Sequence, residues 1–161
     1  MRLMKTLTLL GVLLVAGPII ASSAPMTKRE GWRVIETDAG FSELVQNLEA
    51  NIKANKMNIV TAASASDGAK AEGIDIPGNR VVGVYRNDYA RRMLEASLAA
   101  GIEAPIRFYV TADENGTATL SYKLPSTVFA PYFDEGGDEL RKLATELDEI
   151  FAKIADDTIK S

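Results

Sequence analysis

Apolar residues recur at helical spacing in two segments of the chain. In the first segment they lie every three or four positions, at Phe41, Leu44, Val45, Leu48 and Ile52. In the second they follow a strict three-four alternation, at Leu140, Leu143, Leu147, Ile150 and Ile154. This period predicts an amphipathic helix over 40–54 and a long amphipathic helix from Asp138 to about Ile159.

Other segments carry the β-branched and aromatic residues that are typical of strands. These predicted strands are 32–36, 57–63, 80–86, 106–111 and 118–124. The last two alternate in polarity, and the turn between them contains Asn115-Gly116. An Asn-Gly step between alternating segments predicts a tight hairpin, so these two strands should pair antiparallel.

Two shorter helices are predicted between the strands. The small, polar segment 64–79 leaves room for a single helical turn before its Pro-Gly step. The segment 87–100 opens with an Asn-Asp capping pair, and Gly101 follows it. A glycine just after a helix favours a left-handed cap, in which Ile102 is expected to pack back on Leu98.

The resulting order of elements, β-α-β-α-β-α-β-β-α, predicts the fold class. The hairpin makes the sheet mainly antiparallel, and the helices are too few to cover both of its faces. We therefore expect an α+β two-layer sandwich with the helices on one face of the sheet. Such a sheet leaves a face or an edge without a cover, so a homodimer is expected.

The first residues are typical of a secretory signal peptide. Arg2 and Lys5 precede an apolar run over 7–20, and small residues follow at 21–24. A basic start, an apolar run shorter than a membrane span and a small-residue exit define such a peptide. The alternative is an uncleaved anchor, which the short run and its Pro18 disfavour.

The predicted organisation is a signal peptide over 1–23, a polar lead-in over 24–31 and one domain over 32–161. We therefore expect a periplasmic or secreted protein with no stable membrane insertion after cleavage. Its mature net charge of −6 makes nucleic acid a poor partner, because phosphate groups attract basic surfaces.

Composition excludes several classes of chemistry. The 161 residues include no cysteine and no histidine. The first absence excludes disulfides, thiolate nucleophiles and iron–sulfur clusters. The second excludes catalytic triads and dyads that use histidine and removes the commonest metal ligand. No catalytic residue, metal or cofactor is therefore predicted.

Acidic residues gather before the last helix, at Asp134, Glu135, Asp138 and Glu139. Oxygen ligands of this kind suit calcium, but the alternating spacing of an EF-hand loop is missing. The alternative is an acidic helix start, where carboxylates complement the positive end of the helix dipole. This second interpretation is favoured.

Arginines and tyrosines gather on and next to the predicted strands. The candidate ligand-binding residues are Arg86, Arg107, Tyr109, Tyr122 and Ser126. Guanidinium groups bind oxyanions through paired hydrogen bonds, and neighbouring tyrosines would complete a groove for a small molecule. The alternatives are that the arginines pair with acidic residues of 134–161 and that the tyrosines pack in the core.

Several short motifs occur in order along 69–125. They are Ala-Lys-Ala-Glu-Gly-Ile-Asp-Ile-Pro at 69–77, Gly-Ile-Glu-Ala-Pro at 101–105, Asp-Glu-Asn-Gly at 113–116 and Leu-Ser-Tyr at 120–122. With these motifs the chain resembles the DUF302 (TT1751-like) family over nearly its whole mature length. The resemblance implies a β-α-β(4)-α core, similar to the TATA-binding-protein arrangement, and dimerisation. It implies no activity.

The chain departs from the family pattern at two places. Many members carry an Asp-His pair where this chain has Ser64-Ala65, and many carry Phe-Gly-Asn-Pro where it has residues 84–87. The resemblance therefore indicates a divergent, exported member.

Three functions stay open at this point. The leading hypothesis is a non-catalytic dimer that binds a small ligand or a protein partner beside the sheet. One alternative is an enzyme that uses carboxylate, tyrosine or lysine groups, or a bound organic cofactor. The other is a structural protein-interaction module, which an exposed apolar patch on the last helix would favour.

Overall fold

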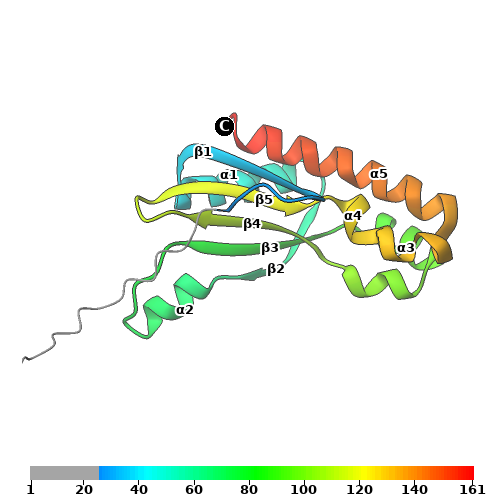
Figure 1. Cartoon of the computed structure of the whole chain (residues 1–161), viewed down its shortest axis with the longest axis horizontal. Coiled ribbons are helices and arrows are strands. Elements are labelled where there is room, and N and C mark those ends of the chain that lie inside the picture. The colour runs from blue at the N-terminus through cyan, green and yellow to red at the C-terminus, as the bar shows by residue number, and fades with distance from the viewer. Residues whose placement is uncertain (1–25) are drawn as a thin grey trace, which may run out of the picture.

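Five strands form one antiparallel sheet in the order β1-β5-β4-β3-β2 (Figure 1). The computed structural model describes residues 26–161. The strands are β1 (Trp32–Gly40), β2 (Asn58–Ala63), β3 (Asn79–Tyr85), β4 (Ile106–Ala112) and β5 (Thr117–Lys123). The predicted hairpin joins β4 to β5, and Asp113 closes its turn by accepting hydrogen bonds from the backbone N–H groups of Asn115 and Thr117.

The predicted signal peptide over 1–23 and the start of the lead-in lie outside the described residues. The periplasmic or secreted location therefore stays a prediction, as does the homodimer. Within 26–161, no helix is long and apolar enough to cross a membrane.

Helices connect the strands and cover one face of the sheet. They are α1 (Phe41–Ala54), α2 (Ala65–Ala71), α3 (Asn87–Ala96), α4 (Pro125–Phe129) and α5 (Phe133–Thr158), with the 3-10 turns η1 (Ala99–Glu103) and η2 (Ala130–Tyr132). Figure 1 shows α5 running along the sheet, with α3 and α4 at one end of the sheet and α2 at the other. The α+β prediction, with helices on one face and a β-α-β(4)-α core, is confirmed.

The core lies between the sheet and the two long helices, α1 and α5. The apolar stripe of α1 buries Leu44, Leu48 and Ile52, as its spacing predicts. On the sheet side, the Phe108 ring stacks on Phe151 of α5 at 4.5 Å between ring centroids. This aromatic contact fixes α5 across the centre of β4.

Residues of β4 alternate between this core and the opposite face of the sheet. Ile106, Phe108 and Val110 are buried under the helices, whereas Arg107 and Tyr109 point to the other face. In the described part of the chain, no helical layer covers that other face. We call it the open face.

The long helix begins five residues before the predicted start. Phe133 opens α5, and Gly137 then interrupts it with a left-handed backbone (φ 56°, ψ −149°). The predicted start at Asp138 is therefore the point where regular helix resumes after a glycine kink.

The prediction for 87–100 is wrong at its C-terminal end. The helix stops at Ala96, because Ser97 adopts an extended backbone and its buried hydroxyl accepts a hydrogen bond from the Ala100 N–H at 3.1 Å. Leu98 and Ile102 are 77% and 80% exposed, so the predicted contact between them does not stabilise the helix end.

Candidate functional site

Three of the five predicted ligand-binding residues line one groove at the end of the sheet. Its lining residues are Trp32, Val81, Glu103, Ile106, Arg107, Tyr109, Tyr122, Lys123 and Val128. The groove has a volume of about 250 Å³. We call it the strand-end groove, because β4 begins and β5 ends there.

Strand register brings the open-face residues of this groove together. Arg107 and Tyr109 are two residues apart on β4, so both side chains leave the same face of the strand. Val81 of β3 is the partner of Tyr109, and Trp32 of β1 is the partner of Lys123 at the end of β5. The groove floor thus comes from four neighbouring strands.

Two cations of the strand-end groove lack a carboxylate partner. Within 26–161, neither Arg107 nor Lys123 forms an ion pair, and neither side chain donates a hydrogen bond. The Lys123 ammonium group lies 5.6 Å from the centroid of the Trp32 ring. Cation–π attraction of this kind holds a cation beside an aromatic surface without neutralising it.

One carboxylate also faces the groove. Glu103, at the end of η1, accepts a hydrogen bond from the Tyr132 hydroxyl at 2.8 Å. This bond raises the pKa of Tyr132, because loss of the phenolic proton would place two negative charges side by side. Glu103 is not paired with Arg107, although the two residues line the same groove.

Tyr122 lines the groove but directs its ring to the opposite side of the sheet. The ring packs against Phe108 at 5.2 Å and Phe151 at 5.5 Å between centroids. Its buried hydroxyl has no well-formed hydrogen bond within the described residues. Burial raises the pKa of this hydroxyl, and the nearby Arg33 guanidinium opposes the rise. Tyr122 therefore offers no hydroxyl to a ligand in the groove.

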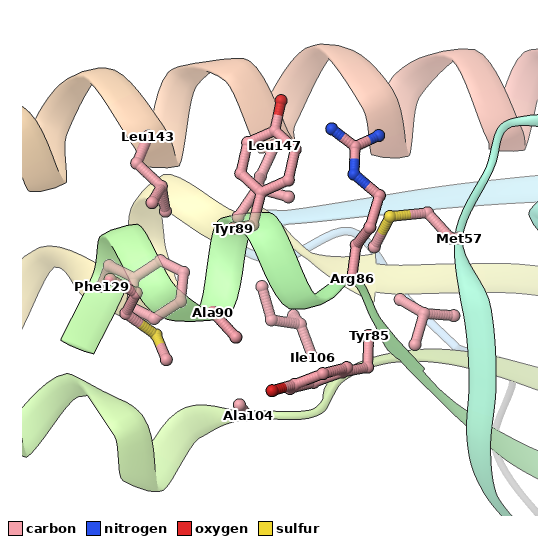
Figure 2. Close-up of a pocket in the computed structure, with 12 residues that line it drawn as sticks. Met57, Tyr85, Arg86, Tyr89, Ala90, Ala104, Ile106, Phe129, Leu143 and Leu147 are labelled. Carbon is pink, nitrogen blue, oxygen red and sulfur yellow. The ribbon is translucent and has the colours of Figure 1, made fainter. Parts of the chain in front are cut away.

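Arg86 lies in a different place, at a small apolar cavity between α3 and α5 (Figure 2). This cavity has a volume of about 30 Å³. The Arg86 guanidinium forms two hydrogen bonds to Asp88, at 2.8 and 3.1 Å, and lies 4.3 Å from the centroid of the Tyr89 ring. Figure 2 shows the guanidinium and the Tyr89 ring directed toward α5. A ligand there would have to displace an existing ion pair.

Ser126 lines neither the groove nor this cavity. It lies in the first turn of α4, where its backbone N–H donates to Asp148 of α5 at 2.9 Å. This contact ties α4 to α5. The structure therefore places Arg107 and Tyr109 in one groove. Tyr122 also lines this groove, but its ring points to the opposite side of the sheet. Arg86 and Ser126 lie elsewhere.

Sequence reasoning missed Trp32, Lys123 and Glu103. Trp32 and Lys123 face each other only because of the register between β1 and β5, which no local motif indicates. Glu103 lay within a recognised motif, but its side-chain direction depends on the 3-10 turn that replaces the predicted helix end.

The alternative interpretation is that the arginines form ion pairs with acidic residues of 134–161. Arg92 forms such a pair. Its guanidinium forms two hydrogen bonds to Glu146 of α5, at 2.7 and 3.2 Å. The acidic residues Asp134 and Glu135 lie in the first turn of α5, as the interpretation as a helix start expects. Among the residues described, no three histidine, cysteine, aspartate or glutamate side chains are grouped closely enough to hold a metal ion.

The pair Arg92–Glu146 predicts a dependence of stability on pH. The hydrogen bond from Arg92 lowers the pKa of Glu146, so this carboxylate stabilises the fold above its unfolded pKa of about 4.3 and loses that contribution as the pH falls through its folded pKa. Glu146→Gln should therefore lower the urea midpoint at pH 7, and the difference from the wild type should shrink at about pH 3.

Glu149→Gln on α5 is the matched control, because Glu149 makes no ion pair with any described residue. It should change the midpoint little at either pH. A Glu146→Gln effect that is the same at both pH values would contradict the role of the pair.

The large apolar side chains exposed at the surface do not gather on the last helix. Next to α5 only Ile159, just beyond its end, is exposed among the large apolar residues described. The most exposed are Leu98 and Ile102, in the segment that follows α3. The feature expected for an interaction module on the last helix is thus not present in this part of the chain.

The sequence of this chain matches a protein-family model, and its fold matches a solved structure. A family model described as a domain of unknown function, DUF302, matches residues 33–158. The crystal structure of an uncharacterized conserved DUF302 protein from Bacillus stearothermophilus matches with a TM-score of 0.69 and 20% identity, over 80% of this chain and 98% of that chain. No curated protein matches the chain. The family model covers well over half of the sequence, and the chain therefore belongs to the DUF302 family.

Proposed function

We propose that this protein binds a small organic anion in the strand-end groove and does not transform it. The observation that carries the proposal is the pair of cations, Arg107 and Lys123, which line the groove and have no carboxylate partner in the described chain. The Lys123 ammonium group also lies beside the Trp32 ring. An unpaired guanidinium binds an oxyanion without first giving up a partner of its own.

Four other arginines support this choice by contrast. Among the residues described, Arg29, Arg91 and Arg141 also form no ion pair, but they do not line the strand-end groove. Arg33, Arg80, Arg86 and Arg92 each form an ion pair with an aspartate or a glutamate. Binding an external anion at any of these four arginines would break the ion pair. It would also leave the freed carboxylate close to the negative charge of the ligand. Arg107 carries no such cost, so the strand-end groove is the favoured site for an anion.

The size and walls of the groove limit the ligand. A volume of about 250 Å³ lies just below the range of about 300–1,000 Å³ that is typical of small-molecule pockets. Trp32, Tyr109 and Val81 provide apolar and aromatic surface. These dimensions suit a single ring or a short branched chain that carries a carboxylate.

The proposal is tested by following tryptophan fluorescence, because Trp32 is the single tryptophan of the chain and lines the groove. Titration with 3-phenylpropanoate should change the emission saturably, and its neutral analogue 3-phenylpropanol should bind at least about tenfold more weakly, since charge-assisted hydrogen bonds contribute about 1.5–3 kcal/mol. Arg107→Gln should weaken binding of the carboxylate by a similar factor. Calorimetry gives the same constants without the fluorophore.

Arg91→Gln is the matched control, because Arg91 is an exposed arginine of α3 that does not line the strand-end groove. It should leave the affinity unchanged. Saturable binding that survives Arg107→Gln, or no binding up to about 10 mM, a free energy of about −3 kcal/mol, would contradict the proposal.

A further inference from the structure

The strand-end groove carries charges of both signs. Glu103 and Arg107 both line it, four residues apart in the chain, yet no pair of their charged atoms lies within ion-pair distance. An isolated glutamate and arginine in one groove would normally approach each other. Here the groove keeps the two charges apart.

The hydrogen bond from Tyr132 explains how Glu103 is held. Tyr132, in η2, donates to Oε1 of Glu103 at 2.8 Å. The second carboxylate oxygen has no hydrogen-bond partner among the residues described. Glu103, which lines the groove, thus retains one carboxylate oxygen without a partner, and Arg107, which also lines it, retains its donors.

We infer that the ligand is a free amino acid with an apolar side chain, an inference that rests on the proposed function. Its carboxylate would bind Arg107 and its ammonium group would bind Glu103. The two groups are attached to one carbon atom of an amino acid, so a single ligand would use a donor and an acceptor that line the same groove. Trp32, Tyr109 and Val81 would then contact the side chain.

The same geometry disfavours ligands that carry only one of the two charges. A simple carboxylate would bind Arg107 but place its own negative charge near Glu103 without the ammonium group that screens it. A simple amine would bind Glu103 and meet Arg107 and Lys123 with like charge. Repulsive groups of this kind create specificity as effectively as attractive ones. A peptide fits less well, because its two charged termini lie on different residues.

Three ligands with the same ring separate these contributions. L-phenylalanine carries both charges, 3-phenylpropanoate lacks the ammonium group and phenethylamine lacks the carboxylate. Measured by Trp32 fluorescence and calorimetry, L-phenylalanine should bind at least tenfold more tightly than either analogue. Because this comparison uses the wild-type chain, its outcome does not depend on whether any variant folds.

Glu103→Gln tests the role of the carboxylate directly. The amide oxygen can still accept the Tyr132 hydrogen bond, so only the charge is removed. This variant should lose at least tenfold in affinity for L-phenylalanine and should bind 3-phenylpropanoate as well as the wild type or better. Glu95→Gln on α3, which does not line the groove, is the control and should change neither affinity.

The outcomes separate this inference from the proposed function. If the wild type binds 3-phenylpropanoate as tightly as L-phenylalanine, or if Glu103→Gln leaves their ratio unchanged, the amino-acid inference is overturned while anion binding stands. If phenethylamine binds as tightly as L-phenylalanine, or if 3-phenylpropanoate does not bind up to about 10 mM, both proposals are overturned.

Discussion

Phe108→Ala is expected to lower the free energy of unfolding by about 3–5 kcal/mol, the loss typical of truncating a buried phenylalanine. The side chain is fully buried at the centre of β4. Its ring stacks on Phe151 at 4.5 Å and meets the edge of Tyr122 at 5.2 Å, so its removal leaves a cavity between the sheet and α5. Such a loss is a large part of the 5–15 kcal/mol that stabilises a typical domain.

Tyr109→Ala is the matched control for this prediction. Tyr109 is the next residue on the same strand, but it points to the open face and is only partly buried. Urea unfolding followed by far-ultraviolet circular dichroism should give a clearly smaller loss for Tyr109→Ala than for Phe108→Ala. Equal losses would mean that the open face is as well packed as the helical face, which would contradict the two-layer description.

Hydrophobic spacing predicted the two long helices well, because α1 and α5 each bury one continuous stripe. All five apolar positions that predicted α5 face the core, although Ile150 is only partly buried. The hairpin could be predicted equally well, because Asp113 and Gly116 define its turn within four residues. In these elements the local pattern and the tertiary packing favour the same conformation.

The elements at the end of the sheet could not be predicted in this way. Pro125 begins α4 one residue after β5 ends, and this helix of five residues is too short for a helical period to appear. The end of α3 depends on the side chain of Ser97, which bonds to the backbone of the next turn. Both features are decided by single residues in a folded context rather than by a repeating pattern.

The candidate site was predictable only where one strand determines it. Arg107 and Tyr109 share a face because they are two residues apart on β4. Trp32 joins them through β5, and that register is fixed by core packing on the other face of the sheet. Arg86 has the right chemistry, but Asp88, two residues later, already occupies its guanidinium.

Gly83→Ala is expected to lower the free energy of unfolding by about 1–3 kcal/mol, the range found when a packed site is overfilled. Gly83 lies in β3 between β2 and β4, and on its open face Pro105 and Thr61 close over it. A Cβ atom would lie 2.9 Å from Cγ of Pro105 and still closer to Oγ1 of Thr61. The proline ring has little freedom to move, so the strand itself would have to shift.

A second substitution distinguishes overfilling from a general effect of alanine in a strand. Adding Thr61→Ala to Gly83→Ala removes the nearer obstacle and should recover part of the lost stability, whereas adding Thr61→Val keeps a branched side chain there and should not.

Gly68→Ala has the opposite expectation: no atom lies within 4 Å of its Cβ, and alanine in helix α2 should stabilise the protein by about 0.5–1 kcal/mol. If Gly83→Ala also stabilised the protein in urea unfolding, the close approach of Pro105 to the sheet would be wrong.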